Sequence, residues 1–301
     1  MGVQIKKYPN LEKAILVACW PGMGNIASIA GDYLVKQLGA EEFAEIESWD
    51  YFYPRKVSIK SGVLQYLEFP TNKFYFKKLE KRDVIIFVGE EEPDYDNGAY
   101  SQGKKALRIG NLILDVAEQF GCHRIYTCCA AISSTHHASA SGVWAAVSHE
   151  YLKKEIKEYP QTVLKSYVEG QGRFSTIPGL KGLLAGMAGA RGMESICLMG
   201  EMPDYLTRVH LPYPKASKAV LQVVSYLLGV DLDFSSIDEM VGQIDKLTDK
   251  IMDDFPREIK DRIEQRRSEL QSKPPTITQE DETWIKQHID ELFKKGGSSG
   301  G

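Results

Sequence analysis

The sequence predicts an α/β fold, in which helices cover a mostly parallel sheet. The first observation is a set of four short apolar runs, at residues 14–20, 83–89, 124–130 and 195–200. These runs do not alternate with polar residues and are bounded by glycine, proline or charge, which is typical of strands covered on both faces. The second observation is that amphipathic helical segments lie between them. Strands that alternate with such helices indicate a layered α/β domain.

Helices and extra strands are predicted between these runs. Apolar residues at intervals of three and four predict helices over residues 25–38 and 105–120. Residues 180–190 mix Leu and Met with Gly and Ala, which predicts a helix packed closely on the sheet. Residues 52–69 and 74–76 predict extra strands of mixed direction, with a turn at Pro70 to Asn72 between them.

The character of the chain changes after about Gly229. Residues 236–239 have the S-x-x-E pattern of a capping box, and an apolar stripe from Ile237 to Ile251 predicts a helix. Pro256 can open a second helix, and Thr278 can cap a third. We favour a hairpin packed on its own domain over a docking element for another subunit. The predicted division is an α/β domain at 1–233, a C-terminal helical extension at 234–295 and a flexible linker, left from cloning, at 296–301.

Composition excludes several classes of protein. The 301 residues, with 43% hydrophobic and 26% charged side chains, are close to the globular average. Lys and Arg number 37 and Asp and Glu 41, so the net charge of −4 gives no reason to expect nucleic acid or an anionic membrane as partner. The five cysteines are an odd number, and no signal peptide or apolar run of about 18 residues occurs. We therefore expect a cytoplasmic protein with reduced thiols.

The glycine turn after the first strand is the most suggestive motif. Its sequence WPGMGNIA contains GxGxxA at Gly22, Gly24 and Ala27, and Gly22, Gly24 and Asn25 are candidates to hold an anion at a helix start. Glu45 or Glu47 stands where a dinucleotide fold places its ribose-binding acid. Pro21 removes one amide from such a cradle. A turn that needs glycine for backbone reasons is the favoured interpretation.

Two strand exits repeat the same residues. GEEEPDY follows the second strand and GEMPDY follows the fourth, so parallel strands deliver similar acids to one edge of the sheet. That edge is where open α/β sheets bind ligands. The candidate binding residues are Glu90, Glu91, Glu201, Asp204 and Tyr205. Turn chemistry is the simpler explanation for each exit alone. The acid spacing matches no defined metal loop, and no metal site is predicted.

No catalytic residue can be assigned. His136 and His137 follow the third strand, where a general base could stand, and His136 is kept as a candidate binding residue. No GxSxG elbow and no P-loop occur, so neither a hydrolase triad nor a nucleotide site has an anchor. Cys128 and Cys129 have the pattern of apolar strand filling more than that of a nucleophile.

Taken in order, these segments resemble the PAC2 family, which is named for a proteasome assembly chaperone. The resemblance rests on PGMGNIA, GEEEPDY, IYTCCAA, GLKGLLAGMAGARGM and the CLMGEMPDY segment, and covers about residues 14–233. It implies a three-layer αβα sandwich of the phosphorylase/hydrolase-like kind and a homo-oligomer, a trimer or tetramer. Members are sometimes labelled ATP-grasp-like, but the lysine pattern of that class is not visible here. Chaperones of this kind can carry a terminal hydrophobic-Tyr-x tail, which Phe293 and the lysines after it do not match.

The favoured function is that of a non-catalytic, oligomeric PAC2-family protein that binds other protein subunits, such as proteasome-like subunits, without a cofactor. The alternative is a small-molecule-binding protein or an enzyme of hydrolase or transferase type at the carboxyl edge of the sheet. In that alternative Gly22, Gly24 and Asn25 hold an anion, and Glu90, Glu201 and Asp204 orient a polar substrate. A dinucleotide-dependent oxidoreductase is a third option.

Overall fold

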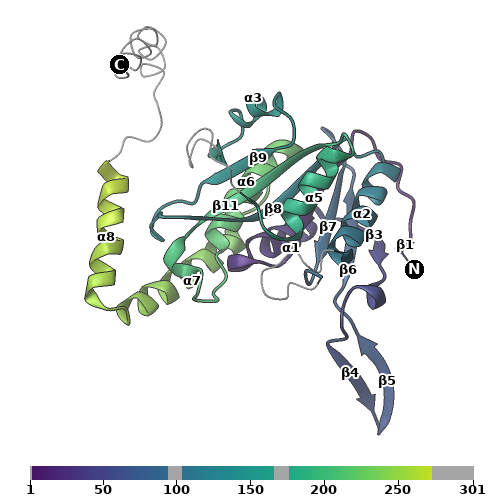
Figure 1. Cartoon of the computed structure of the whole chain (residues 1–301), viewed down its shortest axis with the longest axis horizontal. Helices are drawn as coiled ribbons and strands as arrows, with labels where there is room; N and C mark the ends of the chain where they lie inside the picture. The colour runs from purple at the N-terminus through teal and green to yellow at the C-terminus, as the bar shows by residue number, and fades with distance from the viewer. Residues whose placement is uncertain (1, 94–103, 166–175, 273–301) are drawn as a thin grey trace, which may run out of the picture. The chain divides into compact units, whose positions relative to one another are not determined.

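The computed structural model describes residues 2–93, 104–165 and 176–272 (Figure 1). The chain divides into two compact units, Met1–Phe255 and Pro256–Gly301. The first unit contains the sheet and the candidate sites. In the second unit the described element is α8 (Arg257–Ser272). The third helix predicted to begin at Thr278 lies outside the described residues.

A nine-stranded sheet forms the centre of the first unit. In spatial order its strands are β1 (Val3–Ile5), β3 (Glu41–Ile46), β6 (Asn72–Lys77), β7 (Val84–Gly89), β2 (Ile15–Cys19), β8 (Arg124–Ser133), β11 (Glu194–Pro203), β9 (Val143–Val147) and β10 (Thr162–Leu164). The four middle strands, β7, β2, β8 and β11, run parallel. The strands β6, β3 and β1 continue the sheet in antiparallel pairs on one side, and β9 pairs antiparallel with β11 on the other.

The four parallel strands are those predicted from the apolar runs, and the reason is their burial. Every residue of β2 is buried, because helices cover both faces of the sheet. Val17 belongs to the core on the face of α1 (Ile26–Leu38) and α6 (Pro214–Leu228), whereas Leu16 belongs to the core on the face of α2 (Lys104–Gln119) and α5 (Gly179–Ala190). Figure 1 shows these helices flanking the sheet. The predicted αβα layering is confirmed.

Residues 52–69 do not add strands to this sheet. They form a separate two-stranded hairpin of β4 (Lys56–Lys60) and β5 (Val63–Glu68), with Ser61 and Gly62 at its tip. Ser61 and Gly62 both have positive φ, as two-residue hairpin turns require. The hairpin projects away from the sheet, at the bottom of Figure 1. The short remaining elements are η1 (Met23–Asn25), η2 (Ser48–Asp50), α3 (Leu152–Ile156) and η4 (Asp204–Leu206).

Helix α7 (Ser235–Asp253) packs against α6 within the first unit. The predicted capping box at its start does not form, because the helix begins at Ser235, two residues earlier than the predicted start at Ile237. Ser236 therefore lies inside the first turn, where its hydroxyl donates to the Tyr33 hydroxyl at 3.3 Å. Asp233 accepts from the Ser235 amide at 2.9 Å and holds the chain at the helix entry. Among the described residues, no helix is long and apolar enough to cross a membrane.

Candidate functional site

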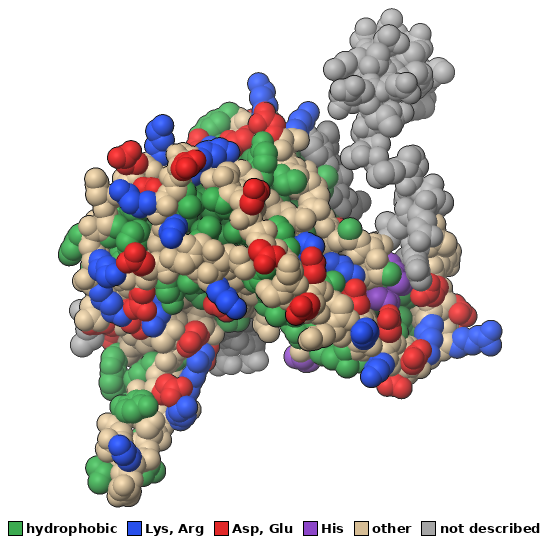
Figure 2. Space-filling model, turned by 180° about the vertical axis from the view of Figure 1, so that it is seen from behind, with side chains coloured by type: hydrophobic (Ala, Val, Ile, Leu, Met, Phe, Trp, Pro, Cys, Tyr) green, Lys and Arg blue, Asp and Glu red, His purple; other side chains and the backbone are tan. Residues whose placement is uncertain are grey.

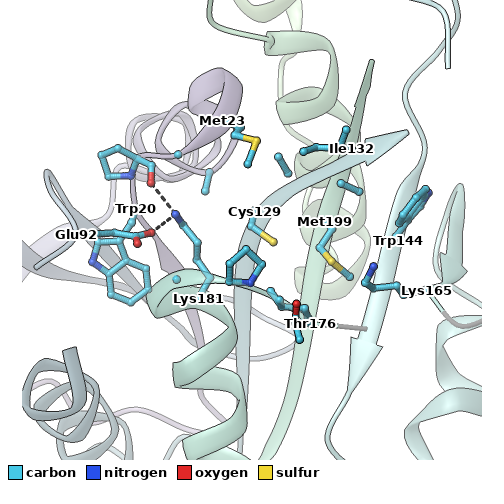
Figure 3. A pocket seen from close by; sticks show the side chains of 18 of the residues that line it. Trp20, Met23, Glu92, Cys129, Ile132, Trp144, Lys165, Thr176, Lys181 and Met199 are labelled. Atoms are coloured by element: carbon cyan, nitrogen blue, oxygen red, sulfur yellow. Dashed lines mark hydrogen bonds and ion pairs between the residues drawn. The ribbon is translucent and has the colours of Figure 1, made fainter. Parts of the chain in front are cut away.

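A cavity of about 850 Å³ lies at the carboxyl edge of the parallel strands (Figure 3). Parallel strands bring their carboxyl ends to one edge, which is where open α/β sheets bind ligands. Segments following β2 and β7 form part of its wall, together with residues of β8, β9 and β11 and the start of α5. Large apolar residues in its wall include Trp20, Met23, Ile132, Trp144 and Met199.

Three of the predicted site residues line this cavity, namely Gly22, Glu90 and Glu91. Arg55, at the base of the hairpin, donates from Nη1 to Glu90 Oε2 at 2.9 Å and from Nε to Glu91 Oε1 at 2.7 Å. The hydrogen bond to Glu91 raises the pKa of Arg55, and the charge of Glu90 adds to this effect. The two carboxylates are thus paired with a cation of the chain itself. No His, Cys, Asp or Glu cluster suited to a metal occurs in the part of the chain that the structure describes.

Lys181 is a site residue that the sequence interpretation did not include. It is 7% exposed, and its Nζ donates to the Pro21 carbonyl at 2.6 Å and forms an ion pair with Glu92. Figure 3 shows its ammonium group between the Pro21 oxygen and the Glu92 carboxylate. The sequence does contain a feature that could have identified it: Lys181 is the single charged residue in the apolar helix sequence GLKGLLAGMAGA. A buried charge in such a helix requires a partner, and it marks a polar point in the cavity wall.

Gly22 has a role beside Lys181. A Cβ at Gly22 would lie 2.9 Å from Lys181 Nζ, which is too close for an ordinary contact. The φ of Gly22 is 176°, which is extended backbone that any residue adopts. Glycine at this position therefore makes room for the lysine side chain, and the sequence could not show this because Lys181 is 159 residues away in the chain.

The thiol beside the cavity belongs to a pair. Cys129 lines the cavity on β8, and its Sγ lies 3.6 Å from the Sγ of buried Cys197 on β11. The hydrogen bond with Cys197, together with burial, raises the pKa of the Cys129 thiol well above its ordinary value. A hydrogen bond with Cys19 and burial raise the pKa of Cys128 in the same direction. Both side chains therefore stay protonated near neutral pH and fill space in the sheet, as expected from the sequence.

Gly24 and Asn25 do not line the cavity. Gly24 has φ of 60°, and a Cβ there would lie 2.9 Å from the Cβ of Tyr213. Its carbonyl accepts from the Tyr213 amide at 2.7 Å, so the turn packs directly on the entry to α6. Asn25 has φ of 49°, a left-handed conformation that asparagine tolerates. The second glycine of the GxGxxA motif, Gly24, thus allows the turn to pack closely against the backbone at Tyr213.

The connection after α1 also differs from a dinucleotide fold. The strand that follows it, β3, pairs antiparallel with β1 and β6. A dinucleotide-binding unit requires that strand to lie parallel beside the first one. Glu45 is in β3, and its carboxylate pairs with Lys6 at 3.0 Å, at the outer part of the sheet. The acid expected to bind a ribose is therefore far from the glycine turn in the strand order.

His136 and Tyr205 belong to a second cluster. The imidazole rings of His136 and His137 lie 4.2 Å apart, and both residues are buried. The hydroxyl of Tyr205 is 2.7 Å from His137 Nδ1, and His137 Nε2 is 3.2 Å from Asp249 Oδ1 on α7. These contacts join the segment after β8, η4 and α7.

Glu201 and Asp204 also lie outside the cavity lining. Glu201 Oε2 accepts from the Gly142 amide at 3.3 Å, next to β9. The Asp204 carbonyl accepts from the Thr207 hydroxyl at 2.7 Å, within the turn that η4 makes. The two similar strand exits therefore reach the same edge of the sheet but have different surroundings: the first borders the cavity, and the second holds neighbouring backbone.

Comparison with known proteins identifies a family and several structures that are similar to this chain. The model of the PAC2 family matches residues 16–252. An uncharacterized protein of Methanocaldococcus jannaschii is 26% identical over 274 residues, which are 91% of this chain and 93% of that protein. The crystal structure of Pyrococcus furiosus PbaB, described as an archaeal proteasome activator, is similar with a TM-score of 0.69 and 26% identity, over 83% of this chain and 97% of PbaB.

Two further solved structures share the fold at lower identity. A proteasome-assembly chaperone homologue of Mycobacterium tuberculosis has a TM-score of 0.62 and 18% identity, over 81% of this chain and 97% of its own. P. furiosus PbaA, described as an archaeal homolog of proteasome-assembly chaperone, has a TM-score of 0.60 and 19% identity, over 91% of this chain and 100% of PbaA. The family match spans most of the chain, from β2 to α7, and this chain belongs to the PAC2 family.

Proposed function

We propose that this chain is a non-catalytic, cytoplasmic homo-oligomer that binds proteasome subunits. The observation that carries the proposal is the similarity to PbaB, a proteasome activator, at 26% identity over 97% of that protein. The PAC2 match over residues 16–252 supports the same role. A trimer or tetramer is the assembly we expect. A protein that acts by contact needs an exposed surface suited to another protein, and the first unit has one.

That surface is the hairpin formed by β4 and β5. Its cross-strand pairs Val57 with Leu67 and Ile59 with Leu64 place four apolar side chains together. Their exposed fractions are 47% for Val57, 36% for Leu67, 66% for Ile59 and 69% for Leu64. Figure 2 shows hydrophobic side chains exposed along the projecting hairpin, at the lower left. A two-stranded hairpin is marginally stable alone in water, and exposed apolar patches of this kind mark sites of protein contact.

The charge of the hairpin favours a different protein over a second copy of itself. The charged residues of the two strands are Lys56, Lys60 and Glu68, so the hairpin carries two positive charges and one negative charge. Two identical hairpins that paired with each other would bring like charges together, which disfavours the contact. A partner surface with apolar side chains and acidic residues complements it. We therefore assign the hairpin to the proteasome subunit, and the oligomer contacts to other parts of the chain.

The cavity supports a role without turnover. Several charged groups of the wall are paired within the chain: Glu90 and Glu91 pair with Arg55 beside the cavity, and Lys181 pairs with Glu92. Lys165, which also lines the cavity, has its Nζ 5.4 Å from the centroid of the Trp144 ring. Acid–base catalysis requires a group that is poised to exchange a proton with a substrate. The neighbouring thiol of Cys129 is held in its protonated form. These features fit a binding protein better than a hydrolase or transferase.

The test uses purified components. The full chain is mixed with the purified proteasome core particle of its own organism, and complex formation is followed by analytical ultracentrifugation together with hydrolysis of a fluorogenic peptide. We expect a complex that contains both proteins. The double variant Ile59→Ser/Leu64→Ser is expected to weaken the complex by about tenfold or more, because contact residues at the centre of an interface each contribute over about 1 kcal/mol.

The matched control is Leu107→Ser/Met240→Ser, which removes two apolar side chains that are 43% and 38% exposed on helices α2 and α7. It should leave the complex intact. Absence of a complex with the unaltered chain would contradict the proposed function. Loss of the homo-oligomer in the hairpin variant, with proteasome binding retained, would instead assign the hairpin to self-association.

A further inference from the structure

The cavity at the carboxyl edge has the size and wall of a small-molecule site. Its volume of about 850 Å³ lies within the range of ~300–1,000 Å³ that is typical of such sites. Large apolar side chains come from separate elements: Trp20 follows β2, Ile132 is on β8, Trp144 is on β9 and Met199 is on β11. Figure 3 shows Ile132, Trp144 and Met199 along one side and Trp20 beside Lys181 on the other. Walls of this kind bind an apolar, flat body.

Lys181 gives the cavity a polar end. A lysine ammonium has three N–H donors, and two of them are used by the Pro21 carbonyl and the Glu92 carboxylate. The third donor remains for an oxygen atom of a ligand. Because Lys181 is 7% exposed, a hydrogen bond from this donor is formed away from bulk water, where it is stronger than at the surface.

Glu92 is the competitor of such a ligand. Its Oε1 accepts from Lys181, and its Oε2 lies 3.5 Å from the Leu180 amide at the start of α5. A carboxylate of the chain thus lies where a ligand carboxylate would gain most from Lys181. Removal of its charge, with the shape kept, is expected to leave the ammonium group to the ligand.

We propose that this cavity binds an amphipathic small molecule, with an aromatic or otherwise apolar body beside Ile132, Trp144 and Met199 and an acidic head group, a carboxylate or sulfonate, at Lys181. This site goes beyond the proposed function, because binding of a proteasome subunit at the hairpin does not depend on it. The cavity and the buried lysine carry the proposal together: the first sets the size and polarity of the ligand, and the second sets the charge of its head group.

The test compares two fluorescent probes that share one ring system. 8-Anilinonaphthalene-1-sulfonate carries an acidic head group, and N-phenyl-1-naphthylamine does not. We expect the full chain to bind one molecule of each per cavity, and the sulfonate more tightly. Lys181→Met should weaken the sulfonate by about tenfold or more, to the level of the neutral probe or below it, because a hydrogen bond to a charged group is lost and Glu92 remains beside the head group. Glu92→Gln should strengthen the sulfonate and leave the neutral probe unchanged.

Two further variants locate the probes. Ile132→Trp adds volume to the cavity wall at a residue that is 44% exposed, and it should weaken both probes equally. The hairpin variant Ile59→Ser/Leu64→Ser removes the other apolar surface and should leave both affinities unchanged. Thermal melting of each variant checks that it is folded.

The proposal is overturned if neither probe binds with one molecule per chain, if Lys181→Met and Glu92→Gln change both probes alike, or if the hairpin variant abolishes binding. The proteasome assay on Lys181→Met separates the two proposals. Retained complex formation with lost preference for the sulfonate is the expected result. A chain that binds the proteasome core but neither probe would leave the proposed function intact and refute the ligand site.

Discussion

The central sheet and the hairpin contain the same kinds of residues in opposite surroundings. In β2 the five residues are at most 1% exposed, whereas Leu64 in β5 is 69% exposed. Helices cover both faces of β2, and no described element covers the four apolar side chains of the hairpin. Burial of apolar area stabilises a fold, and exposed apolar area is available for association. The difference separates side chains that stabilise the first unit from side chains that we expect to bind a partner.

The largest effect should come from the core. Phe87 on β7 is fully buried, with its ring centroid 4.9 Å from that of Trp20 and 4.8 Å from that of Phe74. Phe87→Ala leaves a cavity and should lower the free energy of unfolding by about 3–5 kcal/mol. Urea denaturation measures this. Ile59→Ala on the hairpin should change it by less than about 0.5 kcal/mol, as is usual for surface sites. Equal losses in the two variants would refute the comparison.

A somewhat smaller effect is expected from the charged network beside β8. The Arg124 side chain is 10% exposed and contacts Glu155 at 2.5 Å and Glu194 at 2.6 Å. Arg124→Met leaves two acids without their partner and should cost about 3 kcal/mol in unfolding free energy. In the hairpin, Lys56 and Glu68 are 2.9 Å apart, but both are solvated. Lys56→Met should leave the urea midpoint unchanged, and a shift similar to that of Arg124→Met would contradict this view.

The smallest effect concerns acid stability. Burial acts to raise the pKa of Glu194, but hydrogen bonds from Tyr151 and Arg124 outweigh it and lower the pKa below its ordinary 4.5. A carboxyl whose pKa is lower in the folded state stabilises the protein above the unfolded pKa, and this contribution is lost as the pH falls through the folded value. Melting temperatures between about pH 6 and about pH 3 should therefore fall less steeply for Glu194→Gln than for the unaltered chain.

The hairpin variant Glu68→Gln is the control for that measurement. Because its ion pair with Lys56 is exposed to solvent, the slope of melting temperature against pH should match that of the unaltered chain. A flatter slope in Glu68→Gln than in Glu194→Gln would show that the exposed pair, and not the network around Arg124, governs the response to acid.

Local sequence was sufficient for elements whose pattern reflects their own burial. The four covered strands and the helices over residues 26–38 and 104–119 follow from apolar runs and from three- and four-residue spacing. The strand β3, with sequence EEFAEI, was not predicted, because its exposed glutamates hide a short buried pattern. The strands β9 and β10 were missed as well. The prediction for residues 52–69 was correct about strands but could not show that they leave the sheet.

The candidate site was predictable in part. Gly22, Glu90 and Glu91 were selected because they follow parallel strands, and parallel strands end at one edge. His136, Glu201, Asp204 and Tyr205 were selected by the same rule, but their side chains lie outside the cavity lining. A strand's end sets which edge a residue reaches, and the packing of neighbouring helices sets which face it contacts. Trp144 and Lys181 were missed because neither one follows a parallel strand.

The sequence alone determined the αβα layers and the edge at which the parallel strands end, because hydrophobic spacing and chain direction are local properties. Only the tertiary structure decided that Lys181 fills the space left by Gly22, that Gly24 packs on Tyr213, and that the β4–β5 hairpin remains uncovered. Each of these depends on residues that are distant in the chain and adjacent in space. Contacts of that kind form when the chain folds, and no local pattern encodes them.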